Sequence, residues 1–140
     1  MALGLRTDAK VKIISGVPLF AGLSKRELAQ VASIADEIDL GPGRTLIREG
    51  ERGREFFILL DGSADVTRKG KHLATRKAGD FFGEVALMCN VPRVATVITT
   101  SPTRALVVTD RDFRSLVKRT PGIALKVLEA VGERLPADDA

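Results

Sequence analysis

Glycine recurs at short, regular intervals through the middle of the chain, and this spacing limits the fold more than any other feature. Eight of the 13 glycines lie between Gly41 and Gly83, and turn signals recur about every 8 to 12 residues. Short strands separated by such turns favour an antiparallel sandwich or barrel over parallel strands joined by helices. We therefore expect a mainly β fold, a jelly roll in particular, over residues 36–109. The apolar runs of strand length are Phe56 to Leu60, Ala64 to Val66, Val94 to Thr99 and Ala105 to Thr109.

Helical periodicity flanks this region on both sides. Residues 7–35 carry apolar side chains at helical spacing, and Pro18 interrupts the pattern, which predicts two short helices. Ser24 followed by Glu27 is a capping box that begins the second of them. Residues 110–135 predict two further helices, the last of which presents an apolar face formed by Ile123, Val127, Leu128 and Val131.

Length and charge narrow the class of protein. A chain of 140 residues makes one ordinary domain, which we expect to span residues 1–140. The net charge of +4 is spread evenly, with 11 basic and 10 acidic side chains up to residue 70 and 11 and 8 after it, so no nucleic-acid partner is expected. The sequence has no apolar run of the roughly 20 residues that cross a membrane, no secretory pattern at its start, and no second cysteine to pair with Cys89. We expect a cytoplasmic protein without a membrane partner.

The densest group of cations falls in a predicted hairpin around Gly70. Charge runs of this kind are usually solvated surface. An anionic partner is the alternative interpretation, and the sequence leaves it open. The members of this cationic cluster are Arg68, Lys69, Lys71, Arg76 and Lys77.

One segment, from Gly79 to Val97, sets an acid and an arginine nine residues apart in an otherwise apolar stretch. Gly83 allows the backbone to approach a ligand closely. Glu84 can accept hydrogen bonds from hydroxyl groups, and Arg93 can bond a phosphate through two parallel N–H groups. This combination suits a phosphorylated sugar. The alternative is that Glu84 and Arg93 pair with each other within a strand connection.

The segment resembles the phosphate-binding cassette of the cyclic nucleotide-binding domain, the family of the bacterial catabolite activator protein and of the regulatory subunit of protein kinase A. The family pattern, F-G-E-aliphatic-A-L, a short gap and P-R-x-A-T-V, matches residues 82–87 and 92–97. The resemblance implies an antiparallel β-barrel (a double-stranded β-helix, or jelly roll) with N-terminal helices and two C-terminal helices. It implies a cyclic nucleotide as ligand and no metal or other cofactor. The residues implied to contact that ligand are Phe82, Gly83, Glu84, Val85, Ala86, Leu87, Pro92, Arg93, Val94 and Ala95.

Individual roles follow from the same resemblance. Arg93 would pair with the cyclic phosphate, Glu84 would accept from the ribose 2′-hydroxyl, and Ala95 would leave room for the phosphate. Family members selective for cyclic GMP often carry threonine or serine after the arginine. This chain has Val94, so we expect cyclic AMP to bind better than cyclic GMP. Backbone N–H groups expected to face the anion are those of Gly83, Ala86 and Leu87.

In the resembled family the last helix moves over the bound base as a lid. The chain has no tryptophan or tyrosine, and no phenylalanine follows Phe113. The lid candidates are therefore Val131, Arg134 and Leu135.

Three classes of function are compared. The resemblance implies a non-catalytic regulatory sensor. A phosphodiesterase is disfavoured because the cassette supplies recognition groups but no metal ligands or poised base. A degenerate fold acting as a protein interaction domain is the alternative. Six residues follow Arg134, so we expect movement of the helix from Ile123 to Leu135 to signal to an effector protein, a fused domain outside this chain, or a second copy.

Overall fold

The computed structural model describes residues 5–83 and 85–133, which form two compact units. One unit, residues 35–111, is built of strands, and the other combines the residues before 35 with those after 111. Their boundaries lie where helical periodicity gives way to glycine-punctuated strands in the sequence. The interpretation of residues 1–140 as one domain stays a prediction.

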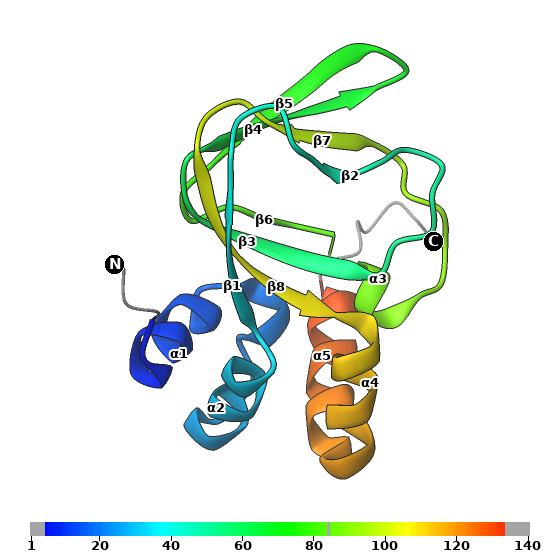
Figure 1. Cartoon of the computed structure of the whole chain (residues 1–140). Helices are drawn as coiled ribbons and strands as arrows, with labels where there is room; N and C mark the ends of the chain where they lie inside the picture. The colour runs from blue at the N-terminus through cyan, green and yellow to red at the C-terminus, as the bar shows by residue number, and fades with distance from the viewer. Residues whose placement is uncertain (1–4, 84, 134–140) are drawn as a thin grey trace. The chain divides into compact units, whose positions relative to one another are not determined.

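The strand unit contains two antiparallel four-stranded sheets in the described part of the chain (Figure 1). Two sheets of this kind are the arrangement of a jelly roll. The first sheet has the order β1 (Asp36–Leu40), β8 (Thr103–Thr109), β3 (Glu55–Asp61) and β6 (Phe81–Phe82). The second has the order β2 (Thr45–Ile47), β7 (Thr96–Thr99), β4 (Ser63–Arg68) and β5 (Lys71–Lys77).

Glycine is required at the turn that joins β3 to β4. Gly62 has a φ of 92°, a backbone conformation that costs other residues energy. A β-carbon at this position would also lie 2.5 Å from the carbonyl oxygen of Pro102. The tight turn lets the chain leave the first sheet at the end of β3 and enter the second as β4.

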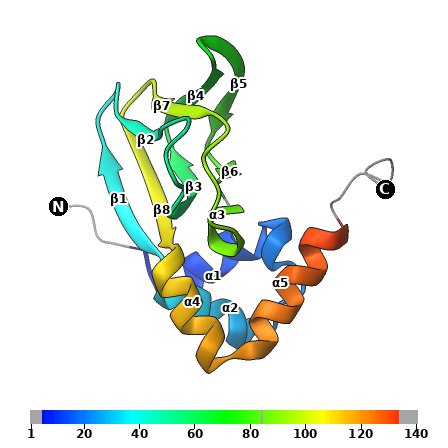
Figure 2. The same cartoon turned by 90° about the vertical axis from the view of Figure 1, so that its right-hand side faces the viewer.

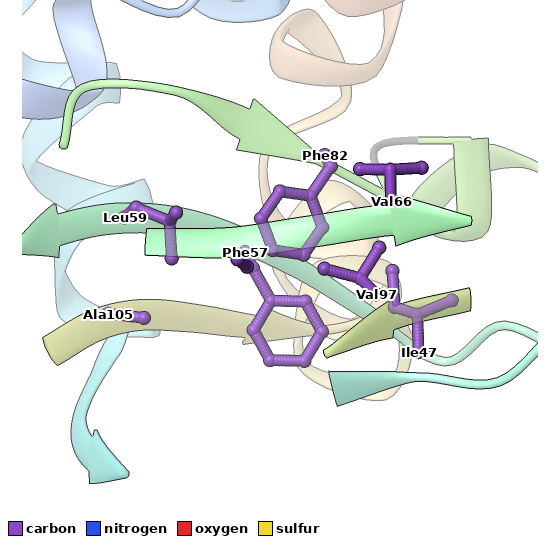
Figure 3. Packing of buried hydrophobic residues seen from close by; sticks show 8 residues of the cluster. Ile47, Phe57, Leu59, Val66, Phe82, Val97 and Ala105 are labelled. Atoms are coloured by element: carbon purple, nitrogen blue, oxygen red, sulfur yellow. The ribbon is translucent and has the colours of Figure 1, made fainter. Parts of the chain in front are cut away.

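Buried residues of both sheets form the core of the strand unit (Figure 3). Phe57 of β3 and Phe82 of β6 stack with ring centroids 5.4 Å apart. Each buried valine, leucine, isoleucine or phenylalanine side chain contributes roughly 1.5–3 kcal/mol relative to its exposed state. The buried members of the cluster are Ile47, Phe57, Leu59, Ala64, Val66, Phe82, Val97 and Ala105.

The helical unit contains α1 (Thr7–Ser15), a 3-10 turn η1 (Pro18–Phe20), α2 (Lys25–Ser33), most of α4 (Asp110–Arg119) and α5 (Pro121–Glu133). The aromatic rings of Phe20 and Phe113 lie 6.4 Å apart and are fully buried. The C-terminal helices α4 and α5 form a hairpin that is seen most clearly in Figure 2. An ion pair between Lys126 of α5 and Glu27 of α2 connects the two ends of the chain within this unit.

The predicted fold class is confirmed: the chain is mainly antiparallel β with helices before and after the sheets. The two N-terminal helices and the capping box at Ser24 are also confirmed. Of the apolar residues that predict the last helix, Ile123 and Val127 are buried and Leu128 is 58% exposed. No helix in the described ranges is long and apolar enough to cross a membrane.

Candidate functional site

The candidate site is built around a glycine that lies between a strand and a short helix. Gly83 follows β6, has a φ of 85°, and precedes α3 (Val85–Met88). A β-carbon on residue 83 would lie 2.8 Å from the carbonyl oxygen of Glu55 and 2.9 Å from Nη1 of Arg93. Both the backbone conformation and the lack of space therefore require glycine here.

Arg93 reaches back to this glycine and to the start of β3. Its Nη1 donates to the carbonyl oxygen of Gly83 at 3.3 Å, and its Nη2 donates to that of Glu55 at 2.5 Å. Two carbonyl bonds fix the plane of a group that carries five N–H donors in all. The side chain is half-buried, so a cation lies at a defined place beside the turn at Gly83.

The backbone of Arg93 is held by a second loop, residues 48–53. Its N–H donates to the carbonyl oxygen of Glu51 at 2.7 Å, and its carbonyl oxygen accepts from the N–H of Gly50 at 2.9 Å. A β-bridge between Arg52 and Pro92 continues this pairing. Both the main chain and the side chain of Arg93 are therefore positioned by residues far from it in the sequence.

Gly53 ends this loop and leaves space for the arginine. A β-carbon at residue 53 would lie 2.6 Å from Nε, 2.7 Å from Cζ and 2.9 Å from Cδ of Arg93. Real β-carbons do not approach other atoms so closely, so even alanine would displace the guanidinium group. The sequence does not reveal this role, because a glycine in a glycine-punctuated region looks like a turn signal.

The other predicted site residues divide into core and surface. Phe82, Ala86 and Leu87 are buried, whereas Pro92 is exposed and Val94 is 67% exposed. The N–H of Ala86 donates to the carbonyl oxygen of Gly83 at 3.1 Å, which closes the turn that leads into α3.

Some predicted positions are described in part or not at all. Ala95 is half-buried against the core cluster of the strand unit. Val85 and Val131 lie in α3 and α5, and the structure describes only their backbone. Glu84 and the lid candidates Arg134 and Leu135 lie outside the described residues.

The part of the chain that contains Gly53, Gly83 and Arg93 matches a known protein family. Residues 37–120 match the family model described as the cyclic nucleotide-binding domain. The chain belongs to the cyclic nucleotide-binding domain family. The resemblance seen in the sequence is thereby confirmed, and the match includes Gly53, Gly83 and Arg93.

Relatives of this cyclic nucleotide-binding domain differ in the nucleotide that appears in their names. The chain is 37% identical over 121 residues to a cAMP-dependent protein kinase regulatory subunit of Mycosarcoma maydis, covering 80% of this chain and 23% of that protein. It is 34% identical over 126 residues to cGMP-dependent protein kinase, isozyme 1, of Drosophila melanogaster, covering 84% of this chain and 16% of that protein. The chain spans less than a third of the length of the first curated relatives that it matches.

A solved structure shares the fold over most of both chains. The N-terminal domain of a transcriptional regulator from Streptomyces coelicolor A3(2) superposes with a TM-score of 0.80 at 26% identity, covering 87% of this chain and 88% of that one. The family and the fold are therefore established by sequence and by structure together.

Proposed function

We propose that this chain is a non-catalytic regulatory module that binds a 3′,5′-cyclic nucleotide. The observation that carries the proposal is the position of Arg93, whose guanidinium plane is fixed beside Gly83 by two backbone carbonyl groups. A cation held in this way can pair with a phosphate without first being ordered, which lowers the entropic cost of binding.

The phosphate and the ribose of the nucleotide each have a proposed partner. Arg93 pairs with the cyclic phosphate, and Glu84 accepts from the ribose 2′-hydroxyl. Ala95, which lies two residues after the arginine, keeps the phosphate position clear. Recognition groups of this kind bind a phosphodiester without supplying a metal-bound water or a general base for its cleavage.

Mutation of Arg93 tests the phosphate contact. Arg93→Ala should weaken cyclic AMP binding by roughly a hundredfold to several-thousandfold, equivalent to about 3 to 5 kcal/mol, because the ligand charge loses its partner. Because the substitution also leaves two backbone carbonyls without this donor, Arg93→Lys is the matched variant. Lysine keeps the charge but has no planar pair of donors, so intermediate affinity is expected.

The measurement is calorimetric titration of nucleotide-stripped protein, with circular dichroism to show that each variant is folded. Folded Arg93→Ala protein that binds cyclic AMP as tightly as the wild type would remove Arg93 from the mechanism. If the folded, empty wild-type chain gives no heat with either cyclic nucleotide, the protein interaction domain becomes the preferred function.

We propose a preference for cyclic AMP over cyclic GMP, on the basis of the residue after the arginine. Val94 is 67% exposed and carries no hydroxyl group to bond the amino group of guanine. Val94→Thr should therefore raise the affinity for cyclic GMP several-fold and leave that for cyclic AMP nearly unchanged. Equal affinities of the wild type for the two nucleotides would contradict the preference.

We propose that α5 carries the signal. Nucleotide binding draws α5 and the residues that follow it, among them Val131, Arg134 and Leu135, over the base and changes a surface that an effector protein, a fused domain or a second copy recognises. Amide hydrogen exchange measured with and without cyclic AMP tests this step. Added protection in α5 is expected, and unchanged exchange throughout residues 121–135 would rule out the movement.

A further inference from the structure

Strand β5 forms one edge of the second sheet. It pairs with β4, and no other described strand lies beyond it. Figure 1 shows the hairpin of β4 and β5 at the top of the strand unit, where it extends past the neighbouring strands. With seven residues, β5 is longer than β2, the three-residue strand at the opposite edge. An exposed edge of this length presents backbone groups that can pair with another extended segment.

The hydrogen bonds around Lys77 show which backbone groups face the open edge. The N–H of Lys77 donates to the carboxylate of Asp80, and its carbonyl oxygen accepts from the N–H of Asp80. Lys77 therefore does not exchange hydrogen bonds with its register partner Ser63 on β4. Antiparallel pairs alternate between bonded and non-bonded types, so the Asp65–Thr75 pair is also non-bonded. The N–H and C=O of Thr75 consequently point away from β4.

The charge of this edge is strongly positive. Lys71 and Lys77 are exposed near the two ends of β5, and Leu73, 56% exposed, lies between them. The cationic cluster identified in the sequence therefore lies on this strand, on the turn that precedes it and at the end of β4. Three acids that contact this hairpin are already engaged: Asp65 contacts His72 and Thr75, Asp80 bonds the backbone of Lys77, and Glu49 bonds the backbone of Lys69.

We infer that the edge of β5 is a docking site for an extended acidic segment of a partner protein, which adds to the second sheet as a further strand. Main-chain bonds at Thr75 would give the alignment, and acidic side chains opposite Lys71 and Lys77 would give the selectivity. This site is separate from the nucleotide site and does not depend on the proposed function.

The same charges disfavour a second copy of this chain as the occupant. If two β5 strands paired antiparallel about Ala74, Lys71 of each copy would lie opposite Lys77 of the other. Like charges directly opposite each other destabilise a strand pair. Lysines on an edge strand are a common means of preventing self-association, and here they also define the complementary charge of the partner.

The inference can be tested with a synthetic eight-residue peptide that alternates glutamate with valine. Titration into ¹⁵N-labelled protein at low salt should shift the amide signals of β5 and slow the hydrogen exchange of the Thr75 N–H. A peptide that alternates lysine with valine is the matched control and should produce neither effect. Peptide-induced changes confined to residues outside β4 and β5 would overturn the inference.

Two sets of variants separate backbone pairing from charge. Thr75→Pro removes the outward N–H and the side-chain bond to Asp65 but no backbone hydrogen bond to β4, and it should abolish binding of the acidic peptide. Lys71→Glu with Lys77→Glu should weaken the acidic peptide at least tenfold and allow the lysine peptide to bind. Lys118→Glu, an exposed change on α4, should leave both peptides unaffected.

Two further results would overturn the inference that a peptide adds to β5 as a strand. Folded Thr75→Pro protein that binds the acidic peptide like the wild type would show a cationic face without strand addition and would overturn the inference. Equal shifts with a short DNA duplex of matched charge would do the same, because they would show that charge alone determines binding.

Discussion

At the residue scale, the site depends on space left for one guanidinium group. Gly53→Ala places a methyl group within 2.9 Å of three side-chain atoms of Arg93. The arginine must move from its two carbonyl acceptors, so we expect cyclic AMP binding to fall roughly tenfold to a hundredfold, or about 1.4 to 2.7 kcal/mol. Overpacking should also reduce the free energy of unfolding by about 1–3 kcal/mol.

Calorimetric titration and chemical denaturation of Gly53→Ala measure the two effects. Gly41→Ala, where nothing lies within 4 Å, is the control and should change neither; normal affinity in Gly53→Ala would show that Arg93 tolerates displacement.

Residues differ in how far the sequence reveals them. Gly83 and Arg93 could be predicted, because a local run of residues carries the family pattern and lies within 19 positions, Gly79 to Val97. Gly53 could not be predicted, since it meets Arg93 across 40 positions of chain and a glycine in a loop looks like any turn signal. The acceptors of Arg93 were hidden for a similar reason, because backbone carbonyls carry no sequence signature.

At the element scale, Glu27 links the start of α2 to α5. Its Oε1 accepts from the backbone N–H of Ser24 at 2.8 Å and from Nζ of Lys126 at 2.6 Å. These hydrogen bonds, that from Lys126 first, lower the pKa of Glu27 below its usual value. A carboxyl group with a lowered pKa adds stability above its unfolded pKa of about 4.3, and that stability is lost as the pH falls through the folded pKa.

Glu27→Gln tests this link between the two helices. Glutamine can still complete the capping box but carries no charge for Lys126, so the loss at neutral pH should be under about 1 kcal/mol because the lysine is 40% exposed. The decrease in unfolding free energy below about pH 4.5 should become shallower in the variant. Denaturant unfolding between pH 3 and 7, repeated with Lys126→Met, measures it. An identical pH profile in Glu27→Gln would show that the pair does not stabilise the fold.

Elements were easier to predict where the signal was local. The capping box and the apolar runs of β3 and β8 were visible because they lie within a few residues. The sequence does not mark the acidic strand β1, and it indicates the cationic strand β5 only as one arm of the hairpin at Gly70, since Asp36–Leu40 and Lys71–Lys77 have few apolar side chains. These two segments become strands because β1 pairs with β8 and β5 pairs with β4. Such pairing depends on the whole sheet and cannot be inferred from the residues of one segment.

At the scale of the whole molecule, the proposed function depends on whether ligand binding in one unit affects the other unit. The cassette belongs to the strand unit and α5 to the helical unit, so the signalling proposed for α5 requires that a ligand bound to one unit changes the other. At a hundredfold excess over its dissociation constant, cyclic AMP should stabilise the protein by about 2.7 kcal/mol, which corresponds to a rise in Tm of roughly 10 °C for a chain of this size. Scanning calorimetry should show one transition that moves as a whole, with a smaller shift for an equal concentration of cyclic GMP. Two transitions, of which cyclic AMP moves one, would mean that the units unfold independently and that α5 does not respond to the ligand. Arg93→Lys should keep the pattern of transitions and reduce the shift, because it weakens binding without changing how the units are joined.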